Sequence, residues 1–453
     1  MHSSRFAASY LIFTSFFVIL RHNFCGKPHI LYRMKFKRKK YLDKLIAGRG
    51  NGLVKIVTGV RRCGKSFLLF NIFVEWLKEN GVTDDHIIGI QFDDFIHRKL
   101  RDPEALLDYI DSQLQRDGTS SYIILDEIQL VDNFVEVMLS LMHLPQVEIY
   151  VSGSNSKFLS SDIVTEFRGR GQEIRVMPLS LPEYMEGTGK DYRDAIQEYF
   201  VYGGLPQVAI LSSYEEKEVF LREMYELTYL RDVEERNHLR NADGLRELIR
   251  VLASGIGAST NPKRISDTFG SVAGIKLTYK SIKEYISYLC DSFLIEEALR
   301  YDVKGRKYIG TETKYYFEDL GIRNVVLNFR QIEESHLMEN LIYNELRGRG
   351  YLVDIGLVGC WGRNSEGKTM RKNLEVDFVV NRGSKRVYIQ SAYAMPSKEK
   401  VEQEERSLIN IGDSFQKIVL VYDNIIMRRN ESGIVTMSLR DFLLREDLLE
   451  SLA

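Results

Sequence analysis

The stretch LVKIVTGVRRCGKSFLLFNIF, residues 53–73, changes its pattern part-way along. Residues 53–58 are a short, mostly apolar run with β-branched side chains, which is typical of a buried parallel strand. A glycine interrupts the run, and apolar residues then recur with helical spacing. The pattern therefore predicts a strand, a tight glycine turn and an amphipathic helix.

The turn fits the pattern G-x-x-x-x-G-K-[ST] of a phosphate-binding loop. Gly59 and Gly64 let the backbone curl so that N–H groups point inward, and the helix adds the positive end of its dipole. The ammonium of Lys65 would reach the β- and γ-phosphates of a nucleotide, and the hydroxyl of Ser66 would ligate Mg²⁺. The alternative is a glycine-rich turn with a surface lysine. We predict that the nucleotide contacts Gly59, Val60, Arg61, Arg62, Cys63, Gly64, Lys65 and Ser66.

An acidic pair follows further along the chain. Residues 121–125 form another apolar strand pattern, and it ends in Asp126 and Glu127. Asp126 would hold Mg²⁺ through water, and Glu127 could polarise the attacking water. An ordinary acidic strand end is the alternative, but the preceding phosphate-binding loop favours the catalytic interpretation.

A third strand is predicted at 147–151, and polar residues follow it. Ser154 or Asn155 could sense the γ-phosphate or orient the water, although a turn that caps the next helix is equally consistent with the pattern. Arg168 and Arg170 could neutralise charge in the transition state, in cis or across the subunit boundary of a homo-oligomer. A solvated basic turn is the alternative for both arginines.

These motifs, with Tyr-Gly-Gly-Leu-Pro at 202–206 and Leu-Arg-Asp at 230–232, resemble a family of prokaryotic AAA-type ATPases that carry a C-terminal domain of unknown function. The similarity extends from about residue 37 to the C-terminus, and its motifs are most specific in the ATPase half. The resemblance implies ATP as the nucleotide. It implies an α/β fold in which a P-loop NTPase parallel sheet of AAA type is followed by a helical lid over the nucleotide.

The remainder of the chain is expected to form two further modules. Helical patterns at 243–254, 262–270 and 278–292 precede a predicted hairpin, the combination of a winged helix. Lys280 and Lys283 would face outward as a DNA reader requires, but winged helices also serve as protein interfaces. The expected domains are an extension at 1–33, an ATPase core at 34–180, a helical lid at 181–240, a winged helix at 241–314 and a restriction-endonuclease-like α/β domain at 315–453.

The last domain is expected to follow the order helix, strands, helix, strand of the restriction-endonuclease-like fold. The predicted helix is 337–346, and the predicted strands are 373–380, 386–390 and 418–422. A nuclease site of this class needs an acidic residue on one strand and D/E-x-K on the next. Asp377, with Glu375 beside it, fills the first role, and Glu339 or Glu345 could add a carboxylate from the helix.

The second strand offers Gln390 and Ala392 where the site needs a carboxylate and a lysine. A neutral amide holds Mg²⁺ weakly compared with a carboxylate. We therefore predict that the domain is not a working nuclease, unless another lysine takes over the missing role.

Composition sets the outer limits. Hydrophobic residues make up 44% and charged residues 28%, which describes a soluble globular protein, and the net charge of −1 means that any basic patch must be local. Four cysteines lie far apart, and Cys63 lies inside the phosphate-binding loop, so a reducing cytoplasm is expected. The helix start and Lys65 would lower the pKa of the Cys63 thiol.

The N-terminal part has a different character. Residues 7–20 are nearly all apolar, but the run is too short to span a bilayer comfortably. The usual beginning of the family resembles the sequence that opens at Met34. We interpret residues 1–33 as an upstream misannotation or a disordered extension, with a membrane anchor as the alternative, and expect no membrane association.

The sequence thus favours Mg²⁺-dependent hydrolysis of ATP that switches the lid and the C-terminal modules around a macromolecular partner, either DNA or a protein. The alternatives are a nucleotide-gated scaffold with negligible turnover and an ATP-driven nuclease. Glu127 favours hydrolysis, because a pure switch needs no group that activates water.

Overall fold

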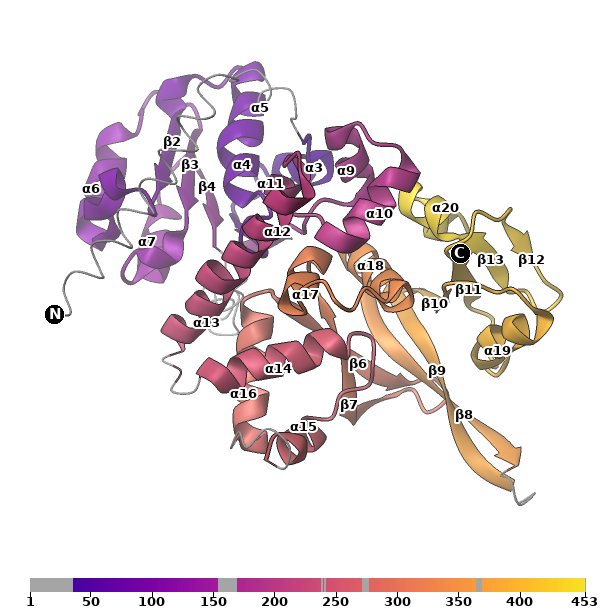
Figure 1. Ribbon diagram of the computed structural model, residues 1–453. Helices are drawn as coiled ribbons and strands as arrows, with labels where there is room; N and C mark the ends of the chain where they lie inside the picture. Colours follow the sequence, from indigo (N-terminus) through magenta and orange to yellow (C-terminus); the bar gives the residue numbers. More distant parts are fainter. Residues whose placement is uncertain are drawn as a thin grey trace.

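Two β-sheets organise the described part of the chain (Figure 1). The computed structural model describes residues 36–153, 169–237, 239, 242–270, 277–363 and 369–452. The first sheet is five-stranded and parallel, with the order β2-β3-β4-β1-β5. Its strands are β1 (Val54–Thr58), β2 (Ile87–Gln91), β3 (Ser121–Asp126), β4 (Val147–Ser152) and β5 (Gly171–Arg175). The predicted α/β fold with a parallel P-loop sheet is confirmed.

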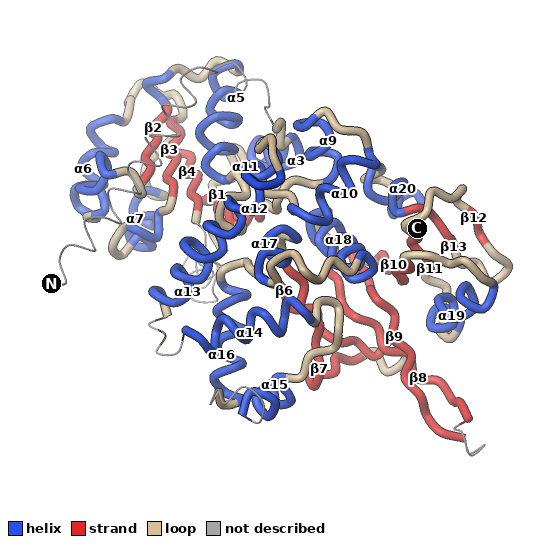
Figure 2. The backbone as a smooth tube through the Cα atoms, viewed as in Figure 1, coloured by secondary structure: helices blue, strands red, loops and turns tan. Residues whose placement is uncertain are grey.

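Helices cover both faces of this sheet (Figure 2). All residues of β1 are buried, and they alternate between the faces: Val57 packs with Leu69 and Phe73, whereas Ile56 packs with Met138 on the other side. Burial on both faces explains why the strand is a continuous apolar run. The covering helical segments are α3 (Lys39–Ala47), α4 (Lys65–Phe67), η1 (Leu68–Phe73), α5 (Val74–Glu79), η2 (Asp84–His86), η3 (Phe95–Arg101), α6 (Pro103–Gln113), η4 (Ile128–Leu130) and α7 (Phe134–Leu141).

A helical segment follows β5. A capping box of Ser180 and Glu183 starts its first helix, and Gly203, with a φ of 73°, ends the second. The helices are α9 (Leu181–Thr188), α10 (Tyr192–Tyr202), α11 (Pro206–Ala209), α12 (Tyr214–Glu223), η6 (Met224–Leu230) and α13 (Arg231–Arg236). This segment is where the sequence predicts the lid.

Three helices and a hairpin come next, as expected for 241–314. They are α14 (Ala242–Ser254), α15 (Pro262–Thr268), α16 (Tyr279–Asp291), β6 (Ile295–Asp302) and β7 (Lys307–Phe317). The hairpin is not a separate wing, however, because β6 also pairs with a strand of the second sheet. The boundary expected between residues 314 and 315 therefore falls inside β7.

The second sheet has eight strands in the order β12-β13-β11-β10-β9-β8-β6-β7 within the described residues. The outer halves of β8 and β9 extend beyond the rest of the sheet as a two-stranded ribbon (Figure 1). Its remaining strands are β8 (Leu352–Arg363), β9 (Thr369–Arg382), β10 (Lys385–Ala392), β11 (Gln416–Val421), β12 (Arg428–Arg429) and β13 (Val435–Ser438). The helices of this part are α17 (Leu320–Val326), α18 (Glu334–Gly348), α19 (Lys398–Ile409), α20 (Leu439–Leu444) and α21 (Leu448–Leu452).

The chain order α18-β8-β9-β10-α19-β11 contains the helix and strands expected from the sequence. The pairs β8–β9 and β9–β10 are antiparallel and β10–β11 is parallel. The assignment of this part to the restriction-endonuclease-like class stays a prediction.

The apolar run at 7–20 lies outside the described residues, as does the whole of 1–33. Elsewhere, none of the helices that the structure describes combines the length and the apolar character that a membrane span requires.

Candidate nucleotide-binding site

The phosphate-binding loop joins β1 to α4 and has the backbone conformation that its glycines predict. Gly59 and Gly64 have φ values of 137° and 101°, a region that favours glycine. A Cβ atom at Gly59 would lie 2.1 Å from the carbonyl oxygen of Val176, so no larger residue fits there. Arg62, within the loop, also has a positive φ, of 66°. The loop is therefore a curled turn at the carboxyl end of the central strand.

The Lys65 side chain is buried inside this turn. Its ammonium donates hydrogen bonds to the carbonyl oxygens of Gly59, at 2.9 Å, and of Val60, at 3.1 Å. Only 5% of the residue is exposed, so the ammonium lies under the loop and not in solvent. A buried cation at this position would meet an anion held by the loop.

Ser66 and Asp126 come together at the same edge of the sheet. Burial raises the pKa of the Asp126 carboxyl group, while hydrogen bonds from the hydroxyls of Ser152 and Ser66 act in the opposite direction. A hydroxyl and a carboxylate in contact are hard oxygen ligands of the kind that Mg²⁺ prefers. The pair that the sequence assigns to the metal therefore fits it chemically.

Ser152 is a member of this group that the sequence analysis did not select. It is fully buried, donates a hydrogen bond to Asp126 Oδ1, and accepts one from the backbone N–H of Glu127 at 3.3 Å. The sheet order explains this position, because β4 lies between β1 and β3 and its last residue reaches both neighbours. The available signal was a polar residue directly at the end of the third apolar run.

Glu127 follows Asp126 in a left-handed conformation, with a φ of 53°. The side-chain amide of Gln129 donates a hydrogen bond to Glu127 Oε2. Such a bond fixes the orientation of a carboxylate that would act as a base.

The remaining sequence candidates lie elsewhere. Ser154, Asn155 and Arg168 fall outside the described residues. Arg170 is exposed next to the first residue of β5, which pairs with the amino end of β1, whereas the phosphate-binding loop follows the carboxyl end. The predicted role of Arg170 in cis is therefore wrong, and only contact with a nucleotide of a neighbouring subunit stays a prediction.

The expectation for Cys63 is also wrong. The thiol is fully buried, and burial raises its pKa although Lys65 and Arg38 act to lower it. Desolvation thus outweighs the nearby cations. The residue is a small packing group beneath the loop.

The segment that the sequence predicts as the lid touches the loop directly. The Tyr229 hydroxyl donates a hydrogen bond to the carbonyl oxygen of Arg61 at 2.9 Å. Pro206 also lies against the loop, since a Cβ at Gly64 would lie 3.8 Å from its Cγ. Both contacts come from the segment that follows β5, and they connect the loop to the lid.

Residues that follow β7 form hydrogen bonds with the segment predicted as the lid. Asp319 is buried and accepts hydrogen bonds from the backbone N–H groups of Gly204, at 2.7 Å, and Ile322, at 3.0 Å. Asn324 donates to the carbonyl oxygens of Phe200 and Val201, at 2.8 and 2.9 Å. The C-terminal part of the chain therefore anchors the turn at 202–206.

Glu318 lies beside this anchor and close to the loop. Its carboxylate is 3.3 Å from the Arg175 guanidinium, which also lies 3.1 Å from Glu296. Burial raises the pKa of Glu318 to about 7, although Arg175 and Lys65 act to lower it. The carboxylate of the residue directly after β7 thus shares the electrostatic environment of the nucleotide loop.

A second group of charges lies between α18 and the second sheet. Lys314 Nζ is 2.9 Å from Glu339 and 2.7 Å from Glu375, so this lysine of β7 pairs with two carboxylates expected in a nuclease site. Asp377 accepts a hydrogen bond from the Ser391 N–H at 2.7 Å. Burial, with the nearby Glu339 carboxylate, raises the pKa of Asp377. Among the described residues, no cluster of three or more His, Cys, Asp or Glu side chains could hold a metal ion.

The predicted positions of Gln390 and Ala392 in this group are wrong. Gln390 contacts Glu404 and Ser407 on the α19 side, and Ala392 packs among apolar residues on that same side. The alternating faces of β10 instead bring Ser391 toward Asp377. The other helix carboxylate, Glu345, pairs with Arg349 at 2.7 Å.

Comparison with known families agrees with this geometry. Residues 51–185 match the model of a family described as "AAA domain". This part of the chain is therefore similar to an AAA domain. Residues 193–333 match a separate family, described as a domain of unknown function (DUF8612). The match covers α10 from its second residue, α11–α16, the β6–β7 hairpin and α17, but not α9.

Two relatives match nearly the whole chain. An uncharacterized protein of Haemophilus influenzae is 28% identical over 413 residues, which cover 90% of this chain and 98% of the relative. An uncharacterized protein of Methanocaldococcus jannaschii is 26% identical over 418 residues, covering 88% and 86%. The part that matches the AAA model and the parts that follow it thus have similar counterparts together in one bacterial and one archaeal chain.

Similar solved structures include Cdc6p of Pyrobaculum aerophilum, with 13% identity, a TM-score of 0.29, and coverage of 68% of this chain and 94% of that one. The ORC1 protein of Aeropyrum pernix, solved in complex with DNA, has 14% identity, a TM-score of 0.27, and coverage of 67% and 96%. Both scores are low, and the fold assignment stands on the strand order and the loop.

Proposed function

We propose that the chain binds ATP at the loop between β1 and α4, hydrolyses it with Mg²⁺, and uses the reaction to switch the lid and the C-terminal part together around a macromolecular partner. The observation that carries the proposal is the enclosed Lys65 ammonium next to the contact between Ser66 and Asp126. An anion-binding loop and a pair of hard oxygen ligands meet at one edge of the sheet, as phosphoryl transfer requires.

The residues of the chain divide the work by chemistry. Loop N–H groups and Lys65 would bind the phosphates, and Ser66 and Asp126 would hold the metal. Mg²⁺, when bound, supplies positive charge that offsets the phosphate oxygens. Glu127 would accept the proton of the attacking water, with its carboxylate oriented by Gln129. Ser152 would keep the Asp126 carboxylate in position through its hydrogen bond.

The coupling to the lid would pass through two contacts. Tyr229 is bonded to the loop carbonyl of Arg61, so a change in loop shape on nucleotide binding would alter that bond. Asp319 fixes the lid turn to the end of β7. The same apolar core contains Val57 of β1, Leu230 of the lid and Phe317 of β7, which supports motion of these parts as a unit.

Two rivals are less well supported. A scaffold without turnover would have no use for a carboxylate oriented beside Asp126. An ATP-driven nuclease would need free carboxylates for metal, whereas Glu339 is paired with Lys314, and Glu375 with both Lys314 and Arg300. The macromolecular partner would be DNA or a protein, and a homo-oligomer would let Arg170 reach a neighbour's nucleotide. With ATP as its substrate, the protein would act in the cytoplasm.

The experiment measures phosphate release by the purified protein with ATP and Mg²⁺, with and without DNA. Turnover should fall by about 100-fold or more in Lys65→Ala, because a buried cation facing the phosphates is lost. Lys398→Ala removes an exposed lysine of α19 and should leave turnover unchanged. Wild-type ATP affinity in a folded Lys65→Ala variant would overturn the site, and tight ATP binding without turnover in the wild type would favour the scaffold.

A further inference from the structure

The ribbon formed by β8 and β9 carries an exposed tryptophan. Trp361 lies toward the outer end of β8, and 76% of the residue is accessible to solvent. Met370 of β9 is 44% exposed and pairs with Gly362, the residue that follows Trp361 on β8. Large exposed apolar side chains that project from the body of a protein mark interaction sites. A tryptophan in particular offers a flat face for stacking.

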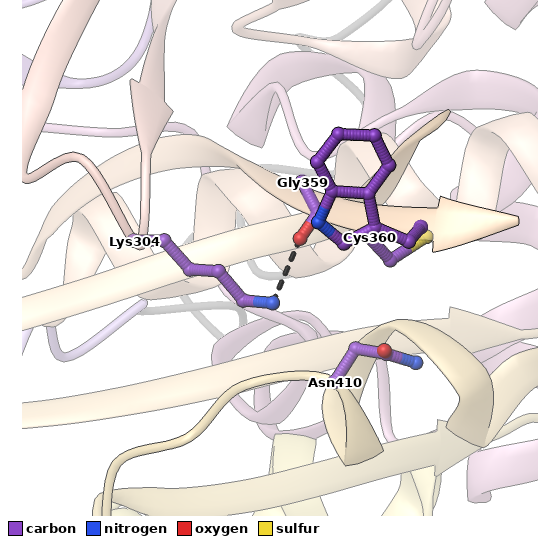
Figure 3. A pocket seen from close by; sticks show the side chains of 5 residues that line it. Lys304, Gly359, Cys360 and Asn410 are labelled. Atoms are coloured by element: carbon purple, nitrogen blue, oxygen red, sulfur yellow. Dashed lines mark hydrogen bonds between the residues drawn. The ribbon is translucent and has the colours of Figure 1, made fainter. Parts of the chain in front are cut away.

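A pocket of about 450 Å³ opens beside this tryptophan. Its lining comes from three separate elements: Lys304 from the β6–β7 turn, Gly359, Cys360 and Trp361 from β8, and Asn410 from the end of α19. Figure 3 shows the Lys304 side chain reaching the strand of Gly359, whose carbonyl oxygen accepts its hydrogen bond at 2.7 Å. That bond holds an ammonium at the wall of the pocket.

The surroundings of the pocket are basic. Arg306 and Lys307 are exposed in the same turn as Lys304, and Lys372 is exposed opposite Cys360 on β9. None of these four cations makes an ion pair with a described residue. The nearest acidic residue in the turn, Asp302, is buried and accepts a hydrogen bond from the Gly305 N–H at 2.8 Å. The uncompensated charge selects an anionic partner.

We propose that this pocket and ribbon bind single-stranded nucleic acid. A base would stack on Trp361, a phosphate would lie at Lys304, and the Asn410 amide is the polar group that could contact the edge of the base. A paired duplex keeps its bases stacked on each other and offers none to the indole. An acidic peptide would use the cations but leave the indole without a partner. The combination of flat ring, amide and ammonium therefore favours an unpaired strand.

The idea that this single-stranded nucleic acid is the partner of the ATP-driven switch rests on the proposed function. Binding of nucleic acid to the pocket is measured without ATP. A failure of this binding can therefore be distinguished from a failure of the ATPase activity. The binding site also lies away from α16, the helix whose Lys280 and Lys283 the sequence analysis favoured as a DNA reader.

The chain contains two tryptophans, Trp76 and Trp361, so fluorescence can be assigned. Trp76→Phe leaves Trp361 as the single reporter, and oligodeoxythymidylate is titrated into this full-length variant. We expect the oligonucleotide to quench the fluorescence of Trp361 in a saturable manner. In a labelled-oligonucleotide assay, Trp361→Ala should weaken binding by about 5- to 150-fold, the loss of one stacked base. Lys304→Ala should reduce the slope of log affinity against log salt by roughly 0.7.

Controls separate the alternatives. Trp361 is exposed, so its replacement should leave the circular dichroism spectrum and the Tm unchanged. Lys280→Ala should keep the wild-type affinity. The proposal is overturned if the oligonucleotide does not quench Trp361, if polyglutamate quenches it equally, or if Lys280→Ala weakens binding while Trp361→Ala does not.

Discussion

Replacement of Glu318 by glutamine should make the protein more stable at alkaline pH. The Glu318 carboxyl group is 3% exposed at the end of β7, and burial raises its pKa from 4.5 to about 7. Glutamine has nearly the same shape but never ionises. Arg175 would keep its second carboxylate partner, Glu296, at 3.1 Å, so the substitution should not leave a buried cation unpaired.

The sign and size follow from proton linkage. Between pH 4.5 and about 7 the folded chain keeps a proton on Glu318 that the unfolded chain has lost. Glu318 therefore makes its full contribution to the free energy of unfolding below pH 4.5. This contribution is lost as the pH rises through the folded-state pKa of about 7. At about 1.4 kcal/mol for each pH unit between the two values, the loss reaches roughly 3 kcal/mol at alkaline pH.

The assay is thermal unfolding of wild type and Glu318→Gln across the range from acid to alkaline pH. The variant should have the higher Tm above neutral pH, and the two curves should converge toward the acid end. Glu402→Gln, on the exposed side of α19, should follow the wild type throughout. Parallel pH profiles for wild type and Glu318→Gln would refute the placement of an ionisable carboxyl group in this buried position.

Two further predictions concern Cys63 and the carboxylates beside Lys314. Cys63 should react slowly with iodoacetamide in the native protein and rapidly after unfolding in urea, because it is buried and its pKa is raised; fast native labelling that ATP suppresses would support the reactive thiol instead. Supercoiled DNA should stay uncut with Mg²⁺ or Mn²⁺, because Lys314 pairs with Glu339 and Glu375; cleavage that is lost in Asp377→Ala but kept in Lys65→Ala would contradict this.

The central site could be predicted from the sequence because its parts are local. The glycines, Lys65 and Ser66 lie within eight residues, as G-x-x-x-x-G-K-[ST] requires, and Asp126 ends an apolar strand. Ser152 depends on sheet order instead. That β4 lies between β1 and β3 is a long-range fact, which no spacing along the chain reveals.

Other features required the tertiary fold. Arg170 appears close to the loop in the motif order, but the parallel pairing of β5 with β1 places it at the opposite edge of the sheet. The Glu318 contact joins β7 to Arg175 of β5 across the whole lid segment. The sequence predicts the β6–β7 hairpin, but the pairing of β6 with β8 cannot be derived from the residues of the hairpin alone.

Glu127→Gln tests most directly the central claim that the chain hydrolyses ATP with Glu127 as the base. The substitution replaces one carboxylate oxygen by an amide nitrogen, so it should affect hydrolysis but not ATP binding. The protein is mixed with labelled ATP and Mg²⁺, and the bound nucleotide is identified after rapid separation. The account predicts that the variant retains ATP with near wild-type affinity and releases phosphate about 10²- to 10⁴-fold more slowly, because an amide fits the space but cannot accept a proton from water. Turnover in Glu127→Gln equal to that of the wild type would contradict it.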